Sequence, residues 1–117
     1  MRPIRIHKHL LSIARHESFK GDVIRSKMSA LAISNDHRRI LAQAHNKKVL
    51  GQSYWTLHAE ERLLSRCREV IETILIYRAN GCGSSRPCPK CYQLIKDSGV
   101  KRIIYNDGKQ WLSELVK

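Results

Sequence analysis

The most informative absence in this chain of 117 residues is that of a long apolar run. No segment approaches the roughly 18 apolar residues that a membrane helix needs, so a membrane protein is excluded. Residues 1–8 are not followed by an apolar signal core, and we therefore expect a cytoplasmic protein with no membrane partner. Internal repeats, linkers and low-complexity tracts are also missing. Together with the length, this predicts one domain over residues 1–117.

Cysteine is too scarce for a disulfide framework. There are four cysteines, and the closely spaced pair Cys88 and Cys91 suits metal binding better in an intracellular chain. Aromatic residues make up only 6% of the chain, so support for a surface that stacks on nucleic-acid bases is thin.

Acidic residues are also few, with 10 Asp and Glu against 22 Lys and Arg, for a net charge of +12. Residues 1–50 hold 11 basic and only 3 acidic side chains, so the excess lies toward the N-terminal half. Such a charge implies an anionic partner such as nucleic acid or a nucleotide phosphate. A merely solubilising surface is the alternative, and charge alone does not decide between them.

Hydrophobic periodicity predicts alternating helices and strands. Ile6, Leu10 and Ile13 recur at helical spacing and indicate a first helix. A strand hairpin is expected over 27–34 and 40–44, followed by a polar loop across residues 45–53. A second helix is expected to begin near His58. Its inward face comprises Ala59, Leu63, Cys67 and Val70.

The C-terminal half continues the alternation. Residues 73–77 form a short apolar, β-branched run typical of a buried strand. A third helix starts at Pro87, presents Leu94 and Ile95 inward, and stops at Gly99. Two more strands are expected over 102–105 and 109–116. The order predicts an α/β fold, a three-layer α/β/α sandwich with a mixed five-stranded sheet.

Candidate metal ligands stand at the start of the second and third helices. Zinc takes nitrogen and sulfur ligands in a tetrahedron, and a catalytic site keeps one position open for water. His58, Cys88 and Cys91 supply three ligands, and the two cysteines share a helix face at a spacing of three. A fourth protein ligand is not obvious, with Cys82 as the nearest candidate.

Glu60 is the candidate catalytic residue. Zinc lowers the pKa of its water, and a nearby carboxylate takes the proton and passes it to the reacting ring. Glu61 follows directly and is expected to be a solvated helix residue. A lone His-x-Glu or Cys-x-x-Cys is a weak signal, but the two joined in this order at two helix starts are strong.

His58-Ala59-Glu60 and Pro87-Cys88-x-x-Cys91 match the signature of zinc nucleobase deaminases. The chain resembles a small member of the cytidine deaminase superfamily, in the cytidine and deoxycytidylate deaminase branch. The resemblance implies that His58, Cys88 and Cys91 bind Zn²⁺ and that Glu60 shuttles protons. It further implies that the Ala59 backbone contacts the pyrimidine edge and that the Asn46 side chain holds the sugar. An ordinary turn asparagine is an equal interpretation of Asn46.

Departures from the relatives bear on the substrate. Arg86 and Pro89-Lys90 replace the acidic residue and the methionine usual in tRNA adenosine deaminases, so adenine is disfavoured. Cys91-Tyr92-Gln93 replaces the Cys-Arg-Gln typical of enzymes that act on the free nucleoside. We therefore expect cytosine deamination in CMP- or dCMP-type nucleotides, with single-stranded DNA or RNA as the alternative partner. A homo-oligomer is compatible with this prediction.

Two further side chains are candidate substrate contacts. Trp55 lies just before His58 and either walls the base pocket or packs in the core. Arg86, beside the zinc loop, could grip a phosphate. A hypothesis of another class is a nucleic-acid-binding module with a purely structural zinc. Glu60 argues against it, because a closed structural site needs no carboxylate two residues after the histidine.

Overall fold

A computed structural model describes residues 1–20, 27–49, 52–67, 69–79 and 84–117. Its main sheet has six strands in the order β1-β8-β7-β6-β2-β3. The strands are β1 (Arg2–Pro3), β2 (Met28–Ile33), β3 (Ile40–His45), β6 (Thr73–Arg78), β7 (Arg102–Asn106) and β8 (Trp111–Leu115). Only β6 and β7 pair in parallel, so the sheet is mixed.

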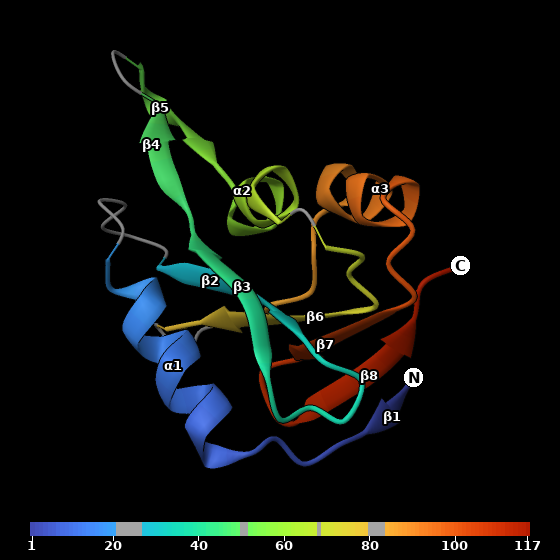
Figure 1. The fold of residues 1–117 in the computed structure, drawn as a ribbon. Helices are drawn as coiled ribbons and strands as arrows, with labels where there is room; N and C mark the ends of the chain where they lie inside the picture. Colours follow the sequence, from blue (N-terminus) through green and yellow to red (C-terminus); the bar gives the residue numbers. More distant parts are fainter. Residues whose placement is uncertain (21–26, 50–51, 68, 80–83) are drawn as a thin grey trace.

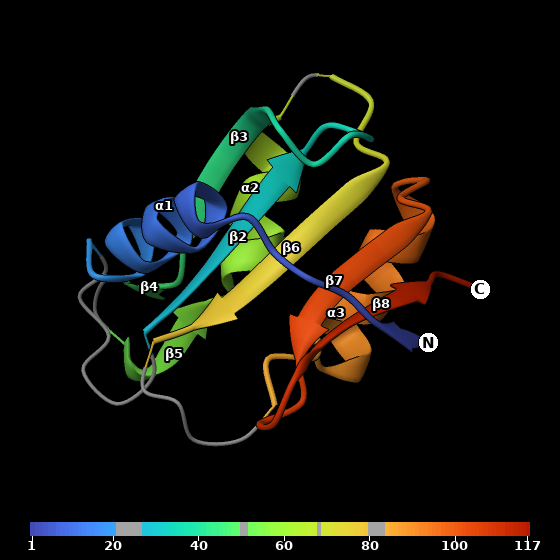
Figure 2. The ribbon, with the colours of Figure 1, turned by 90° about the horizontal axis from the view of Figure 1, so that it is seen from below.

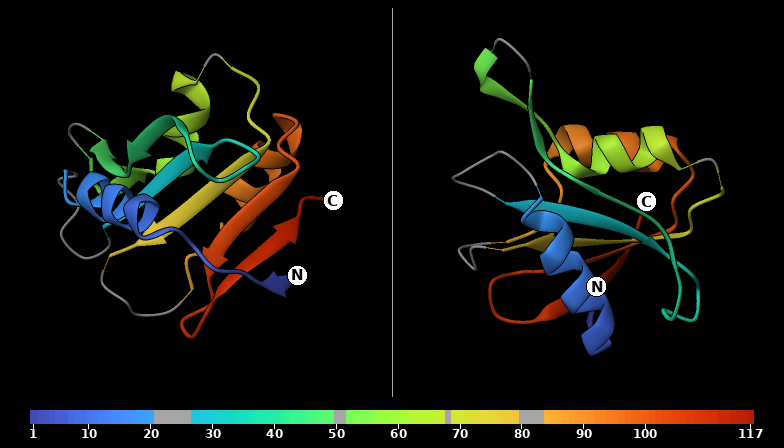
Figure 3. Two further views of the ribbon diagram at one scale, coloured as in Figure 1. Left: turned by 60° about the horizontal axis from the view of Figure 1, so that its bottom comes forward. Right: turned by 60° about the vertical axis from the view of Figure 1, so that its left-hand side comes forward.

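Helices cover the sheet on both faces, which gives the predicted three layers (Figures 1 and 3). Helices α2 (Ala59–Arg66) and α3 (Pro89–Asp97) lie side by side on one face. Helix α1 (Lys8–Ser18) lies on the other, where it packs against β2, β3 and β6, while the chain before it crosses β7 and β8 (Figure 2). Among the described residues, no helix is long and apolar enough to cross a membrane.

The central strands hold the core because alternate side chains enter different layers. On β6, Ile74 and Ile76 belong to the cluster beneath α2 and α3, whereas Leu75 belongs to the cluster beneath α1. All three are fully buried. A strand covered on both faces is continuously apolar, and this explains why Thr73–Arg78 is recognisable from its sequence.

The predicted five strands are all present, and the sheet is larger by β1, which pairs with β8 at the edge. A two-residue strand with Pro3 carries no periodic signal. The prediction of a polar loop over residues 45–53 was wrong. Instead, β4 (Lys47–Val49) and β5 (Gln52–Leu57) form a separate two-stranded sheet that projects from the body (Figure 1). Its polar strands lack the apolar alternation that identifies a half-buried strand.

Two predictions about inward-facing residues were also wrong. Helix α2 ends at Arg66, so Val70 lies beyond it and is 83% exposed. On α3, Ile95 is fully buried but Leu94 is 37% exposed. The predicted stop at Gly99 is confirmed, since this residue follows the helix with φ of +83°, a conformation that glycine adopts without strain.

Candidate metal and catalytic site

The ends of two helices bring the signature residues together. His58 is the residue before the first turn of α2, and β5 leads the chain directly into it. Cys88 has the same place on α3, with Pro89 in the first turn, where a missing N–H costs nothing. Cys91 follows within that first turn. Since α2 and α3 pack against each other, residues separated by 30 positions meet at one point.

The three predicted ligand atoms form one cluster, within 4.8 Å of one another. His58 Nδ1 lies 3.1 Å from Cys91 Sγ and 3.7 Å from Cys88 Sγ. Zinc bonds of about 2.1 Å to nitrogen and 2.3 Å to sulfur place tetrahedral ligand atoms roughly 3.5–3.8 Å apart. The observed distances lie on both sides of this range, from 3.1 Å to at most 4.8 Å, so the three atoms are close enough to bind one metal ion after small shifts of the side chains. The fourth candidate ligand, Cys82, lies outside the described residues.

The chemistry of the donors fits a cation as well. Cys91 is fully buried, and burial raises the pKa of its thiol far above the ordinary value, with the Glu60 charge and Cys88 adding to the rise. A thiolate here is costly without a positive partner. A coordinated dication reverses this, because it deprotonates a thiol ligand. The pocket is therefore suited to bind a metal ion.

Glu60 lies in the first turn of α2 and is only 3% exposed. Burial raises the pKa of its carboxyl, although a hydrogen bond from its own backbone N–H and the charge of His58 oppose the rise. Its side chain lies within reach of Cys91. A buried carboxyl beside a set of metal ligands is placed to take up and release protons there.

Glu61 is not the solvated residue that its position in the sequence suggested. Its carboxylate accepts the His58 backbone N–H at 3.4 Å and lies 3.5 Å from Lys90 Nζ on α3. Through these two contacts it ties the ligand histidine to the helix that carries both cysteines. A glutamate three residues after a helix start is a known capping position, and this was the available signal.

Ala59 and Asn46 are both buried. Ala59 is the first residue of α2, between the histidine and the glutamate. Asn46 separates β3 from β4, and its Oδ1 accepts the Met28 N–H at 3.0 Å. Arg62 of α2 donates to the His45 carbonyl at 2.7 Å, so the strand end beside Asn46 is fixed to the helix with the motif. Asn46 thus joins the end of β3 to the start of β2.

Arg86 is already engaged within the protein. Its Nη2 lies 2.9 Å from Glu114 Oε2 on β8, and its guanidinium lies over the ring of Tyr92, 5.1 Å from the centroid. Tyr105 donates to the same Glu114 carboxylate at 3.0 Å. These contacts hold the loop before Cys88 to the sheet. Trp55 lies within β5, but its side chain is outside what the structure describes.

A buried glutamate that the sequence did not reveal stabilises the end of β3, next to Asn46. Glu17 of α1 accepts from Gln43 Nε2 at 2.6 Å and lies 2.6 Å from His45 Nδ1. Burial alone would raise the pKa of Glu17, but hydrogen bonds from His45, Lys20 and Gln43 outweigh it and hold the pKa below its ordinary value. Glu17 therefore ties α1 to the end of β3, next to Asn46.

Solved structures share this fold at low sequence identity. A cytidine deaminase from Burkholderia pseudomallei matches with a TM-score of 0.69 and 15% identity over 96% of this chain and 94% of that chain. One from Mycobacterium leprae matches with a TM-score of 0.62 and 19% identity over 87% of each chain. The dCMP deaminase of cyanophage S-TIM5, solved with dCMP and dUMP, matches with a TM-score of 0.59 and 21% identity over 85% of this chain and 82% of that chain.

No curated protein matches the chain. The family model described as the cytidine and deoxycytidylate deaminase zinc-binding region matches residues 4–107, which is most of the sequence and includes the His58, Glu60, Cys88 and Cys91 cluster. Zinc is accordingly the cofactor that this cluster is suited to hold. The chain belongs to the cytidine and deoxycytidylate deaminase family.

Proposed function

We propose that residues 1–117 act as a single deaminase domain that hydrolyses the cytosine base of CMP- or dCMP-type nucleotides to uracil and ammonia. The observation that carries this proposal is the buried Glu60 beside the three converging ligands His58, Cys88 and Cys91. Membership of the family supports the reaction class. The phosphorylated substrate is supported by the likeness to a dCMP deaminase and by the basic charge of the chain.

The bound zinc supplies a Lewis acid that makes water a nucleophile at neutral pH. Glu60 takes a proton from the attacking water and delivers it to the ring nitrogen. It then takes the second proton from the new hydroxyl group on the ring carbon and passes it to the departing amine, which leaves as ammonia. The overall reaction consumes one water molecule and releases one molecule of ammonia. Burial of Glu60 keeps its carboxyl away from bulk solvent, so the proton moves between the carboxyl and the substrate.

The proposed substrate contacts come from residues that lie near the three candidate ligands in the structure or in the sequence. The Ala59 backbone contacts the pyrimidine edge, Asn46 holds the sugar, and Trp55 walls the base. Support comes from Ala59 lying between His58 and Glu60, and from the fixed, buried position of Asn46. The Arg86 guanidinium already faces the Glu114 carboxylate with its Nε and Nη2, so Arg86 is the weakest of the four proposed contacts.

Single-stranded DNA or RNA remains the second candidate substrate, favoured by the net charge of +12. Release of ammonia from a panel of dCMP, CMP, cytidine, adenosine, single-stranded DNA and single-stranded RNA separates the candidates. We expect turnover of dCMP or CMP and none of adenosine. Readily deaminated cytosine in an oligonucleotide, with both nucleotides untouched, would contradict the nucleotide assignment. Sedimentation of the same preparation tests the predicted homo-oligomer.

A further inference from the structure

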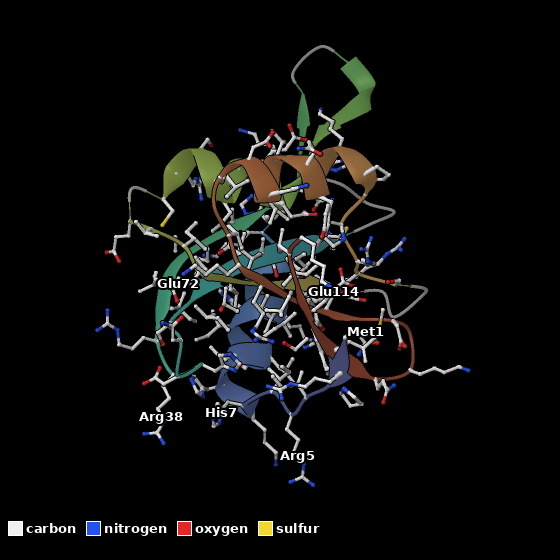
Figure 4. The ribbon with its side chains drawn as sticks, turned by 90° about the vertical axis from the view of Figure 1, so that its right-hand side faces the viewer. Met1, Arg5, His7, Arg38, Glu72 and Glu114 are labelled. Carbon is white, nitrogen blue, oxygen red and sulfur yellow. The ribbon has the colours of Figure 1, made fainter. Side chains whose placement is uncertain are left out.

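The end of the molecule farthest from α2 and α3 carries a set of exposed basic side chains. They come from the segment before α1, from the first residues of α1 and from the turn between β2 and β3, and all are exposed. We call this set the basic end: Arg5, His7, Lys8, His9, Arg38 and Arg39. Figure 4 shows Arg5, His7 and Arg38 together at this end, with the two arginines extended away from the body.

Direct contacts join the two segments into one surface. His9 Nε2 lies 3.4 Å from the Arg38 carbonyl oxygen, across 29 positions of sequence. The rings of His7 and His9 are 5.5 Å apart. Between the segments, burial lowers the pKa of His37, and the charges of Arg102 and His7 lower it further.

Little negative charge opposes these cations. Asp36 is the one acidic residue in segments 5–9 and 34–39, and its Oδ1 is occupied by the Ser34 hydroxyl at 2.5 Å and the Arg38 N–H at 3.1 Å. Within the described parts of the chain, no carboxylate forms an ion pair with the four Lys and Arg of the basic end. The two cations beside the proposed zinc ligands differ from those of the basic end, because Arg86 and Lys90 each form an ion pair with a glutamate.

From this arrangement we propose that the basic end binds the phosphate backbone of single-stranded nucleic acid, independently of base sequence. When exposed, unpaired Lys and Arg side chains bind phosphates, the counterions condensed on the nucleic acid are released, and this release drives binding. Phosphate contacts position a strand without reading its bases. The surface lies away from the deaminase cluster, so it goes beyond the proposed function and does not depend on it.

Binding of a labelled oligonucleotide made only of thymidine tests the proposal, because such a strand offers no cytosine to the deaminase site. Anisotropy is measured on the zinc-loaded protein over a range of salt concentrations. The variant Lys8→Gln/Arg38→Gln/Arg39→Gln is compared with Lys96→Gln/Lys109→Gln/Lys117→Gln, whose lysines are exposed on α3, in the β7–β8 turn and at the C-terminus. Each variant lowers the net charge by three.

Each phosphate contact to a single strand contributes about 0.7 to the slope of log affinity against log salt. We expect the basic-end variant to bind at least about tenfold more weakly at low salt and to lose about 2 from this slope. The control variant keeps the wild-type affinity and slope. Arg38→Lys/Arg39→Lys, which retains both charges, keeps most of the affinity.

Equal weakening in both triple variants would show that only net charge matters and would overturn the proposal. Unchanged binding in the basic-end variant would do the same. Vesicles containing anionic lipid form the last arm. Binding to them as tight as to the oligonucleotide, lost in the same variant, would assign the surface to membranes instead. Turnover of dCMP, measured in parallel, reports separately on the proposed function.

Discussion

The two ends of this molecule use charge in opposite ways. At the end that carries the candidate metal site, which we call the zinc end, the candidate ligand and catalytic side chains are buried or half-buried. The nearby cations Arg86 and Lys90 form ion pairs with carboxylates. At the basic end, the Lys and Arg side chains are exposed and form no ion pair with a carboxylate among the described residues. Pairing fixes the geometry that a catalytic site needs, whereas unpaired surface charge gives long-range attraction without precise placement.

Removal of one metal ligand should have the largest effect and should act at the zinc end alone. We expect Cys91→Ser to reduce zinc from one per chain to nearly none, to abolish turnover and to lower the melting temperature, because metal binding is coupled to folding. Elemental analysis and thermal unfolding measure these effects. Cys67→Ser, a change at a cysteine outside the cluster, should keep its zinc. Stoichiometric zinc in Cys91→Ser would refute the ligand assignment.

Glu60→Gln should separate chemistry from metal binding. The amide preserves size but cannot carry the proton, so we expect kcat to fall by about 10²–10⁴-fold while zinc content and folding remain. Glu61→Gln is the matched control: it alters a contact that joins α2 and α3, and should cost about 1 kcal/mol of stability with turnover mostly retained. Greater loss of turnover in Glu61→Gln than in Glu60→Gln would reverse the two roles.

Glu17→Gln should weaken the support beneath the site. Loss of a buried, hydrogen-bonded carboxylate is expected to cost about 1–3 kcal/mol in the free energy of unfolding at neutral pH. The folded pKa of Glu17 is lowered, so its contribution is complete above the unfolded pKa of about 4.3 and disappears as pH falls through the folded value.

Urea unfolding over this pH range should therefore show the gap between wild type and Glu17→Gln closing toward acid. The exposed Glu69→Gln serves as a control and should show little difference at any pH. A gap that stays constant down to low pH would mean that the Glu17 charge does not stabilise the fold.

Arg86→Met is expected to have the smallest effect. Because the Arg86 side chain is 43% exposed, its ion pair with Glu114 should contribute about 0.2–1 kcal/mol. A double-mutant cycle with Glu114→Gln measures this coupling, and KM for dCMP should rise only slightly, because Arg86 is the weakest of the proposed substrate contacts. A KM raised about tenfold or more, with kcat retained, would instead assign Arg86 to the substrate phosphate, as the sequence suggested.

Local pattern explains which features could be predicted. The proposed zinc ligands and Glu60 lie in short motifs at helix starts, and the apolar run of β6 marks a central strand. Contacts between distant polar residues have no such signal. The pairs Arg86–Glu114 and Glu17–His45 each span 28 positions. Strands β4 and β5 were missed because they pair only with each other and carry no apolar alternation.

The most direct test of the central claim is uracil formation from dCMP by one preparation before zinc removal, after removal by a chelator, and after zinc is restored. We predict turnover, then its loss, then its recovery, with Glu60→Gln inactive in the zinc-loaded state. Turnover of cytosine substrates that persists in fully metal-free protein would contradict the claim. So would zinc-loaded, folded protein that deaminates no cytosine nucleotide, nucleoside or oligonucleotide.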